Sequence, residues 1–250
     1  MGLLLPLEAA AVLALVLLAV WRRGRRVADP SLDVPERIHD ALLSARLPDG
    51  AATAIATEAA ILYYALAAWT RKPFAPPGAR TFSYHRRNAY AAMLYAVVGI
   101  ALVEMTAVDL IVRASHVTAA NVLLVVDALA AIWLLGFARA VQLRPILLAS
   151  DALLIRNGLG VRVDVPLENA TIEFGRVRAP AKGTPRYLRA AMGQPNALIT
   201  LGEPASVHRA YGRPRPVDRI GLVLDDPNGF EAAWRSFAPE APDSRAAELI

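Results

Sequence analysis

Two long apolar runs with arginine-rich outer flanks constrain the fold of this chain more than any other feature. Residues 88–112 (NAYAAMLYAVVGIALVEMTAVDLIV) and 117–138 (VTAANVLLVVDALAAIWLLGFA) are each long enough to cross a hydrocarbon core of about 30 Å. The connection RASH has little charge, whereas YHRR precedes the first run and RAVQLR follows the second. Because Lys and Arg favour the cytoplasmic side, we expect a transmembrane hairpin over 88–138 with both flanks and the C-terminal half inside.

A third apolar run begins close to the N-terminus. Residues 3–21 are followed by RRGRR, so the positive charge comes after the run, and a secretory signal peptide carries it before. We therefore predict an uncleaved transmembrane anchor over 1–21 with the N-terminus outside. Three spans in a chain of this kind indicate a multi-pass protein of the inner (plasma) membrane.

The stretch between the anchor and the hairpin, residues 22–87, contains two predicted helices on the cytoplasmic side. In DVPERIHDALLSARL, Asp33 is the expected N-cap, Pro35 lies in the first turn, and Glu36 completes a capping box. The alanine-rich segment 51–69 is about as long as a membrane span. A full crossing would place RRGRR outside, so an interfacial or re-entrant helix is favoured over a fourth span.

The pattern changes after residue 144, where short strand-like segments are separated by turn residues. Seven such segments are followed by PNGFEAAWRSFA, a predicted helix with Asp226 as N-cap and Pro227 at its first position. We expect a small β-barrel or sandwich over 144–240, closed by this C-terminal helix, and a tail over 241–250. The predicted fold is thus a helical membrane half joined to a small cytoplasmic β domain.

This second half resembles the bacterial PH-like domains that follow membrane hairpins in many uncharacterised membrane proteins. The similarity covers roughly residues 144–238 and is carried by RPILLASDALLIRNGLGVRVDVPLENATI and the closing IGLVLDDPNGFEAAWRSF. It rests on the pattern of strands and the final helix and includes no catalytic signature. The resemblance implies a binding or assembly module rather than an enzyme.

Polar residues inside the two hairpin runs form the first candidate site. Glu104 and Asp127 lie about equally far from the connection, on the order of 17 Å at 1.5 Å per residue, and Asp109 pairs in the same way with Asn121. Charged groups in hydrocarbon cost at least about 2.5 kcal/mol each, so these residues should face protein, a partner or water. Helix-to-helix contacts are one reading. A proton or cation site is the other, because two adjacent carboxylates do not both ionise easily.

A second group of polar and aromatic residues is expected near the cytoplasmic surface. An aromatic and basic belt at the headgroup level explains most of it, and an acid–base or metal pair made by Glu58 and His85 is the alternative. The group consists of Glu58, Tyr63, Tyr64, Tyr84, His85, Arg86 and Arg87.

The loop RVRAPAKGTPRYLR is a third candidate, because its basic residues would suit anionic lipid headgroups if the β domain lies beneath the membrane. These residues are Arg176, Arg178, Lys182, Arg186 and Arg189.

Composition narrows the function classes. The chain has no cysteine, which excludes disulfides and thiolate chemistry, and its net charge of +5 is explained by arginines beside apolar runs rather than by a nucleic-acid motif. No phosphate loop or nucleophile elbow is recognisable. We predict no cofactor, no metal and no nucleic-acid partner, and expect the lipid bilayer and a membrane or cytoplasmic protein as partners. An assembly, regulatory or scaffold role is favoured over a membrane-embedded enzyme or a proton- or cation-handling subunit.

Overall fold

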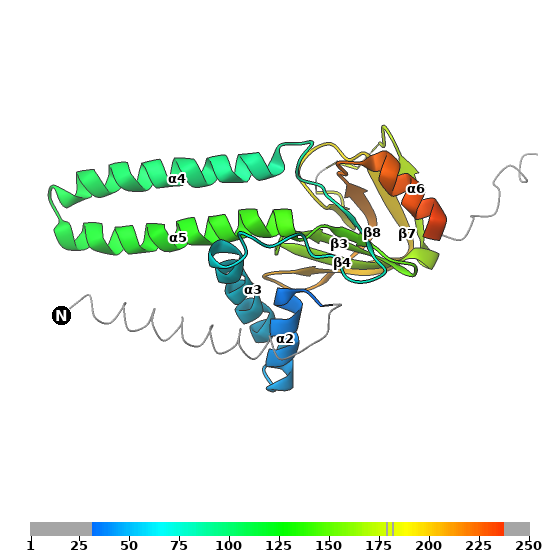
Figure 1. Cartoon of the computed structure of the whole chain (residues 1–250), viewed down its shortest axis with the longest axis horizontal. Coiled ribbons are helices and arrows are strands. Elements are labelled where there is room, and N and C mark those ends of the chain that lie inside the picture. The colour runs from blue at the N-terminus through cyan, green and yellow to red at the C-terminus, as the bar shows by residue number, and fades with distance from the viewer. Residues whose placement is uncertain (1–31, 179, 182, 238–250) are drawn as a thin grey trace, which may run out of the picture.

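A computed structural model describes residues 32–178, 180–181 and 183–237 of the chain. Its most extended feature is a hairpin of two helices, α4 (Tyr90–Arg113) and α5 (Val117–Leu143), which projects from a β domain (Figure 1). The predicted anchor over 1–21, RRGRR and the tail over 241–250 lie outside the described residues.

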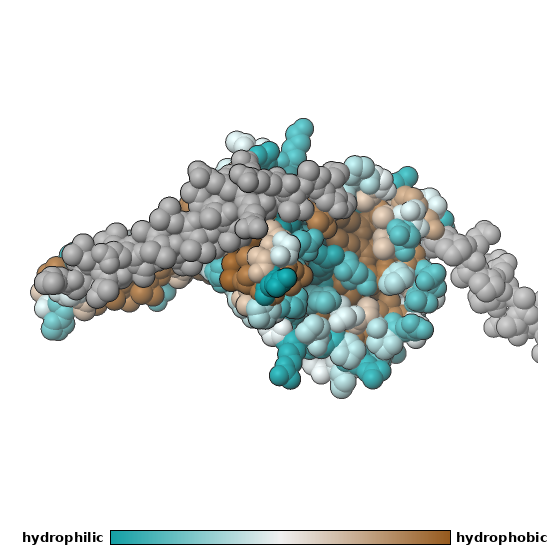
Figure 2. Space-filling view, turned by 90° about the horizontal axis from the view of Figure 1, so that it is seen from below, coloured by the Kyte–Doolittle hydropathy of each residue, from teal (hydrophilic) through white to brown (hydrophobic). Residues whose placement is uncertain are grey.

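In the described part of the chain, α4 and α5 are the helices long and apolar enough to cross a membrane. In each, only 11% of the most apolar stretch is buried, which is unlike a core helix of a soluble protein. Side chains such as Val103 and Ile111 are 72% exposed. Hydrophobic surface shows along the visible part of the hairpin, whereas the β domain shows mostly hydrophilic side chains (Figure 2). The prediction of two apolar membrane-length helices is confirmed.

The β domain is built on one mixed sheet of eight strands. Seven follow one another across it in the order β1-β2-β3-β4-β7-β8-β6, and β5 pairs with β7 beside β4. All neighbours are antiparallel except β6 and β8. The sheet does not close into a barrel along this path. The strands are β1 (Arg80–Phe82), β2 (Ile146–Leu148), β3 (Ala152–Asn157), β4 (Val161–Pro166), β5 (Ala170–Phe174), β6 (Tyr187–Arg189), β7 (Ala197–Arg209) and β8 (Arg215–Leu222), with a 3-10 turn, η1 (Leu167–Asn169), before β5.

Helix α6 (Pro227–Phe237) closes the domain, as the sequence predicted (Figure 1). Its cap is confirmed, because the Gly229 N–H donates to the Asp226 side chain at 2.9 Å. The rings of Phe230 and Trp234 are buried in the main core among the inward-facing apolar residues of the sheet, and Phe237 packs at its margin.

Three features of the sheet differ from the strand pattern read along the sequence. Strand β1 comes from residues 80–82, before the hairpin, and pairs with β2. Strand β6 lies in the basic loop, where no strand was predicted. Two of the seven predicted strand segments, NALITL (196–201) and SVHRAYG (206–212), belong to the single strand β7, whose pairing with β8 is irregular between Thr200 and Ala205. The first follows from a pairing partner, β2, that lies beyond the hairpin in the sequence, which periodicity does not register.

Helices α2 (Val34–Ser44) and α3 (Asp49–Leu66) pack beside the hairpin on the flank of the β domain (Figure 1). The predicted capping box of α2 is confirmed: Asp33 caps the helix, and the Glu36 side chain accepts from the Asp33 N–H at 2.7 Å. Helix α3 lies between α2 and α5, with apolar clusters on both sides. The interfacial position of the segment 51–69 stays a prediction.

Candidate functional site: a buried ion-pair network beside the hairpin

Strand β3 places an arginine on the opposite side of the sheet from the main core. Leu153 and Ile155 of β3 belong to the main core. Arg156 follows Ile155 and therefore points to the opposite face of the strand, where its side chain is fully buried. Arg156 is directly opposite Arg162 of β4 in the register. Like charges facing each other across two strands are destabilising, so this pair requires an anion nearby.

The first turn of α2 supplies two carboxylates to these arginines. Glu36 Oε1 lies 3.1 Å from Arg162 Nη1 and 3.5 Å from Arg156 Nη1. Asp33 Oδ2 lies 3.5 Å from the same Arg156 nitrogen. The capping box that starts α2 thereby also balances the charge on β3 and β4.

Arg144, the residue after α5, completes the network. Its Nε donates to Asp33 Oδ2 at 2.7 Å, and its Nη2 to Glu36 Oε1 at 3.1 Å. Its Nη1 donates to the Gly158 carbonyl in the β3–β4 turn at 2.6 Å. The side chains of Arg144 and Asp33 are each only 5% exposed. One buried cluster therefore joins the end of the hairpin, the start of α2 and the sheet.

The two buried arginines of the cluster are compensated by nearby carboxylates to different degrees. Burial alone lowers the pKa of Arg144, but the charges of Asp33 and Glu36 outweigh it, so its pKa is raised. For Arg156, burial and the charge of Arg144 prevail, and its pKa is lowered. Its Nε and Nη2 are buried without a hydrogen-bond partner in the described part of the chain, and the Phe74 ring lies 5.2 Å from its Cζ. Arg156 is the under-compensated charge of the network.

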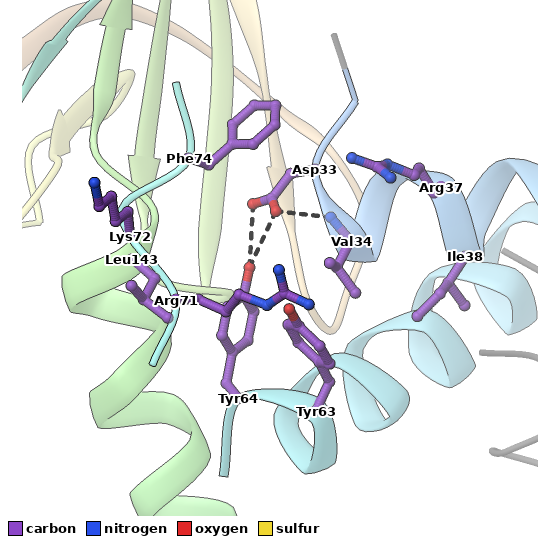
Figure 3. Close-up of a pocket in the computed structure, with 10 residues that line it drawn as sticks. All are labelled: Asp33, Val34, Arg37, Ile38, Tyr63, Tyr64, Arg71, Lys72, Phe74 and Leu143. Carbon is purple, nitrogen blue, oxygen red and sulfur yellow. Dashed lines mark hydrogen bonds between the residues drawn. The ribbon is translucent and has the colours of Figure 1, made fainter. Parts of the chain in front are cut away.

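A cavity of about 290 Å³ opens beside Asp33, between α2, the end of α3 and residues 71–74. The Tyr64 hydroxyl lies 3.2 Å from both Asp33 oxygens, and burial together with the Asp33 charge raises the pKa of Tyr64. The Arg71 side chain reaches toward the Tyr63 and Tyr64 hydroxyls, whereas Lys72 extends away from the cavity (Figure 3).

The network is suited to holding parts of the chain together rather than to acid–base chemistry. Asp33 Oδ1 accepts from the Val34 N–H at 2.7 Å, and Glu36 Oε2 from the Asp33 N–H. With the arginine contacts, all four carboxylate oxygens are therefore engaged. A carboxylate in this state has no free oxygen to present to a substrate proton.

The intramembrane residues predicted from the sequence lie in two places along the hairpin. Glu104 and Asp127 line one cavity of about 320 Å³ between α4 and α5, at the similar depth expected from counting residues. Asp109 binds Arg113 within α4 at 2.7 Å, and Arg113 also donates to Asn121 of α5 at 3.1 Å. Asp109 and Asn121 are thus bridged by an arginine that the sequence reading left out.

The predicted interfacial residues are distributed over several contacts. The Glu58 carboxylate accepts from the hydroxyl of Tyr211, whereas the backbone N–H groups of residues 85–87 donate to the Asp225 carboxylate. No hydrogen bond or ion pair in the described residues joins Glu58 to His85, the proposed acid–base pair.

The aromatic residues and arginines of that group separate in the same way. Tyr63 and Tyr64 line the cavity beside Asp33, while the buried Tyr84 hydroxyl accepts from the Gly158 N–H at 2.7 Å. Arg86 and Arg87 are exposed.

The described arginines of the basic loop are exposed, and Lys182 lies outside the described residues. These arginines are Arg176, Arg178, Arg186 and Arg189. In the part of the chain that the structure describes, no group of three or more His, Asp or Glu side chains is placed to hold a metal ion.

The ion-pair network was missed by sequence reasoning. Asp33 and Glu36 were recognised only as a helix cap, and Arg144 only as a flanking charge. One signal was present: IRN in β3 and VRV in β4 place an arginine inside otherwise apolar strands, on both sides of the Asn157-Gly158 turn. Two arginines facing each other across a hairpin indicate an acidic partner from elsewhere.

Comparison with known proteins assigns neither a family nor a function to this chain. No family model, curated protein or solved structure matches the chain.

Proposed function

We propose that this protein is an integral inner-membrane assembly or regulatory module that holds a cytoplasmic PH-like β domain in a fixed orientation beneath the bilayer. The apolar, exposed surface of α4 and α5 supports insertion of the hairpin. The arginine-rich flanks of both helices support a cytoplasmic position for the β domain. Such a module presents a surface to a partner protein and performs no chemistry itself.

The buried ion-pair network is the observation that carries this proposal. Arg144 follows α5 directly, and its contacts to Asp33, Glu36 and Gly158 leave the hairpin little freedom to swivel against the sheet. Close packing reinforces the junction at Gly158, where an added Cβ would lie 2.9 Å from a Val141 methyl carbon of α5. A rigid junction of this kind is useful when a domain must meet its partner at a set height and angle.

The proposal is tested by native electrophoresis and mass spectrometry of the full chain, extracted in mild detergent from its own membranes. We expect a discrete complex that contains a second protein in fixed stoichiometry. The Asp33→Asn/Arg144→Met variant, which loosens the junction, should dissociate that complex while still inserting in the membrane. Arg176→Gln is the matched control, since it removes an exposed charge from the β domain without touching the junction. A chain that migrates alone in every extract, or a complex that the junction variant leaves intact, would contradict the proposal.

A second candidate function is proton or cation handling by the hairpin, and it rests on the cavity shared by Glu104 and Asp127. The test replaces both acids with amides, Glu104→Gln and Asp127→Asn, in the full chain reconstituted into vesicles. Ion flux in the wild type that is abolished in the amide variant would establish this function. Equal flux in both proteins, with equal thermal stability, would leave the two acids as polar contacts between helices.

A further inference from the structure

A groove of about 510 Å³ lies at the base of the hairpin, between the first turn of α4 and the last turn of α5. Alanines at the start of α4 leave it open on one side. The polar part of its lining is basic or neutral: Arg71, His85, Arg86, Arg139 and Gln142. None of the described residues that line it is a carboxylate. A ligand that fits this lining carries negative charge.

The arginine that α5 contributes is held by neutral groups alone. Arg139 Nη1 donates to Gln142 Oε1 at 2.6 Å and Nη2 to the Trp69 carbonyl at 2.9 Å. Its Nε is buried and has no partner in the described part of the chain. Because no carboxylate pairs with this guanidinium among the described residues, its charge is available to an anion that enters the groove.

His85 gives a second, independent indication of a ligand. It is only 9% exposed, lines the groove, and its Nδ1 is buried without a partner among the described residues. Burial and the nearby Arg86 charge lower its pKa, while Asp225 acts in the opposite direction. Buried polar atoms are normally hydrogen-bonded, so an unpaired ring nitrogen on a residue that lines a basic groove marks a place for a bound group.

The surroundings of the groove are those of a headgroup region. Trp69, whose ring lies 5.6 Å from the Arg139 Cζ, is 49% exposed. Above the groove, α4 presents Met93 and Val97, which are 39% and 42% exposed. Tryptophan and arginine gather at membrane interfaces, and apolar side chains continue into the acyl region. A ligand with an anionic head and an apolar tail meets matching chemistry at both ends.

We propose that this groove binds the phosphate of an anionic phospholipid, with Arg86 and Arg139 as its cationic contacts, His85 as a hydrogen-bond partner and Arg71 as a further positive charge at its edge. The assignment rests on the hairpin lying in a bilayer, as in the proposed function, but does not require a protein partner. The acyl chains of the lipid run along the exposed apolar surface of α4. The volume of the groove falls within the range of small-molecule sites, which is more room than a contact at an isolated surface arginine offers.

The test is native mass spectrometry of the full chain in detergent, titrated with phosphatidylglycerol and, separately, with phosphatidylcholine. The Arg71→Gln/Arg86→Gln variant removes two exposed side chains that make no hydrogen bond or ion pair with other described residues, so its fold should be preserved. Arg176→Gln/Arg178→Gln removes the same charge from the basic loop and is the matched control. Melting curves without lipid verify that the three proteins are equally folded.

We expect retention of phosphatidylglycerol but not of phosphatidylcholine, with binding about tenfold or more weaker in the groove variant and unchanged in the control. Equal losses in the two variants would reduce the effect to general surface charge and overturn the proposal. Loss in the loop variant alone would transfer the site to the basic loop. A third arm adds inorganic phosphate. If it displaces the lipid and binds the wild type by itself, the groove is a free-phosphate site and the lipid assignment is wrong.

Discussion

Replacing Arg144 with methionine should test the buried network most directly. The methionine side chain keeps an apolar stem that ends near the position of the arginine Nε. It loses the three hydrogen bonds that Arg144 donates: to Asp33 at 2.7 Å, to Glu36 at 3.1 Å and to the Gly158 carbonyl at 2.6 Å. Among the residues that the structure describes, Asp33 then retains the Tyr64 hydroxyl, the Val34 N–H and the 3.5 Å contact to Arg156. Removing one partner of a buried ion pair costs about 3–5 kcal/mol. We expect a loss of that size, a large fraction of the stability of a typical domain.

The partner substitution, Asp33→Asn, removes the opposite charge and keeps the helix cap, since Asn is as good an N-cap as Asp. It leaves Arg144, Arg156 and Arg162 facing Glu36 alone, so a loss of about 3–5 kcal/mol is again expected. In the double variant both Asp33 and Arg144 have lost their charge, so neither side chain remains as a buried charge without its partner. Its destabilisation should therefore be smaller than the sum of the single effects by about 2–3 kcal/mol.

The assay is reversible unfolding of the full chain in detergent, followed by near-ultraviolet circular dichroism for the wild type, both single variants and the double variant. Arg176→Gln, an exposed arginine, is the control and should fall within about 0.5 kcal/mol of the wild type. Single effects below about 1 kcal/mol that add without coupling would refute the reasoning, because the network would then make no net contribution beyond that of surface charges.

Three further predictions concern other contacts. Gly136→Ala should loosen the packing of α3 on α5 and lower the melting temperature, because its Cβ would overlap the Ile61 carbonyl oxygen; Gly99→Ala, with nothing within 4 Å, should match or exceed the wild type. Trp234→Ala should cost about 3–5 kcal/mol and abolish the cooperative unfolding of the β domain, because the indole is buried in the main core; wild-type unfolding of this variant would contradict that role. Although burial opposes it, backbone donors from residues 86–87 and the nearby His85 charge hold the pKa of Asp225 below its usual value. The resulting stabilisation is full above the unfolded-state pKa of about 3.9, and it is lost as the pH falls through the pKa of Asp225 in the folded protein. Asp225→Asn should therefore make the free energy of unfolding depend less on pH in the acid range. An unchanged pH dependence in this range would exclude the role of Asp225.

Local patterns in the sequence determined the elements whose formation depends on near neighbours. The Asp33–Glu36 capping box, the Asp226–Pro227 start of α6 and the two apolar helices all appear where periodicity and capping rules place them. Counting residues from the connection also put Glu104 and Asp127 beside one cavity, because the rise of an α-helix is nearly constant.

Tertiary structure alone decided which charges are buried and what they contact. Asp33 and Arg144 are 111 positions apart, and Asp33 and Arg156 are 123 positions apart. Likewise β1 joins a sheet whose other strands lie beyond the hairpin, and Glu58 meets Tyr211 rather than His85. An arginine in a strand has the same local preferences whether it faces water or a helix terminus. Its burial is fixed only when α2 packs against β3 and β4, and the energy of that contact depends on the partner charge and on exclusion of water, neither of which is encoded within a window of neighbouring residues.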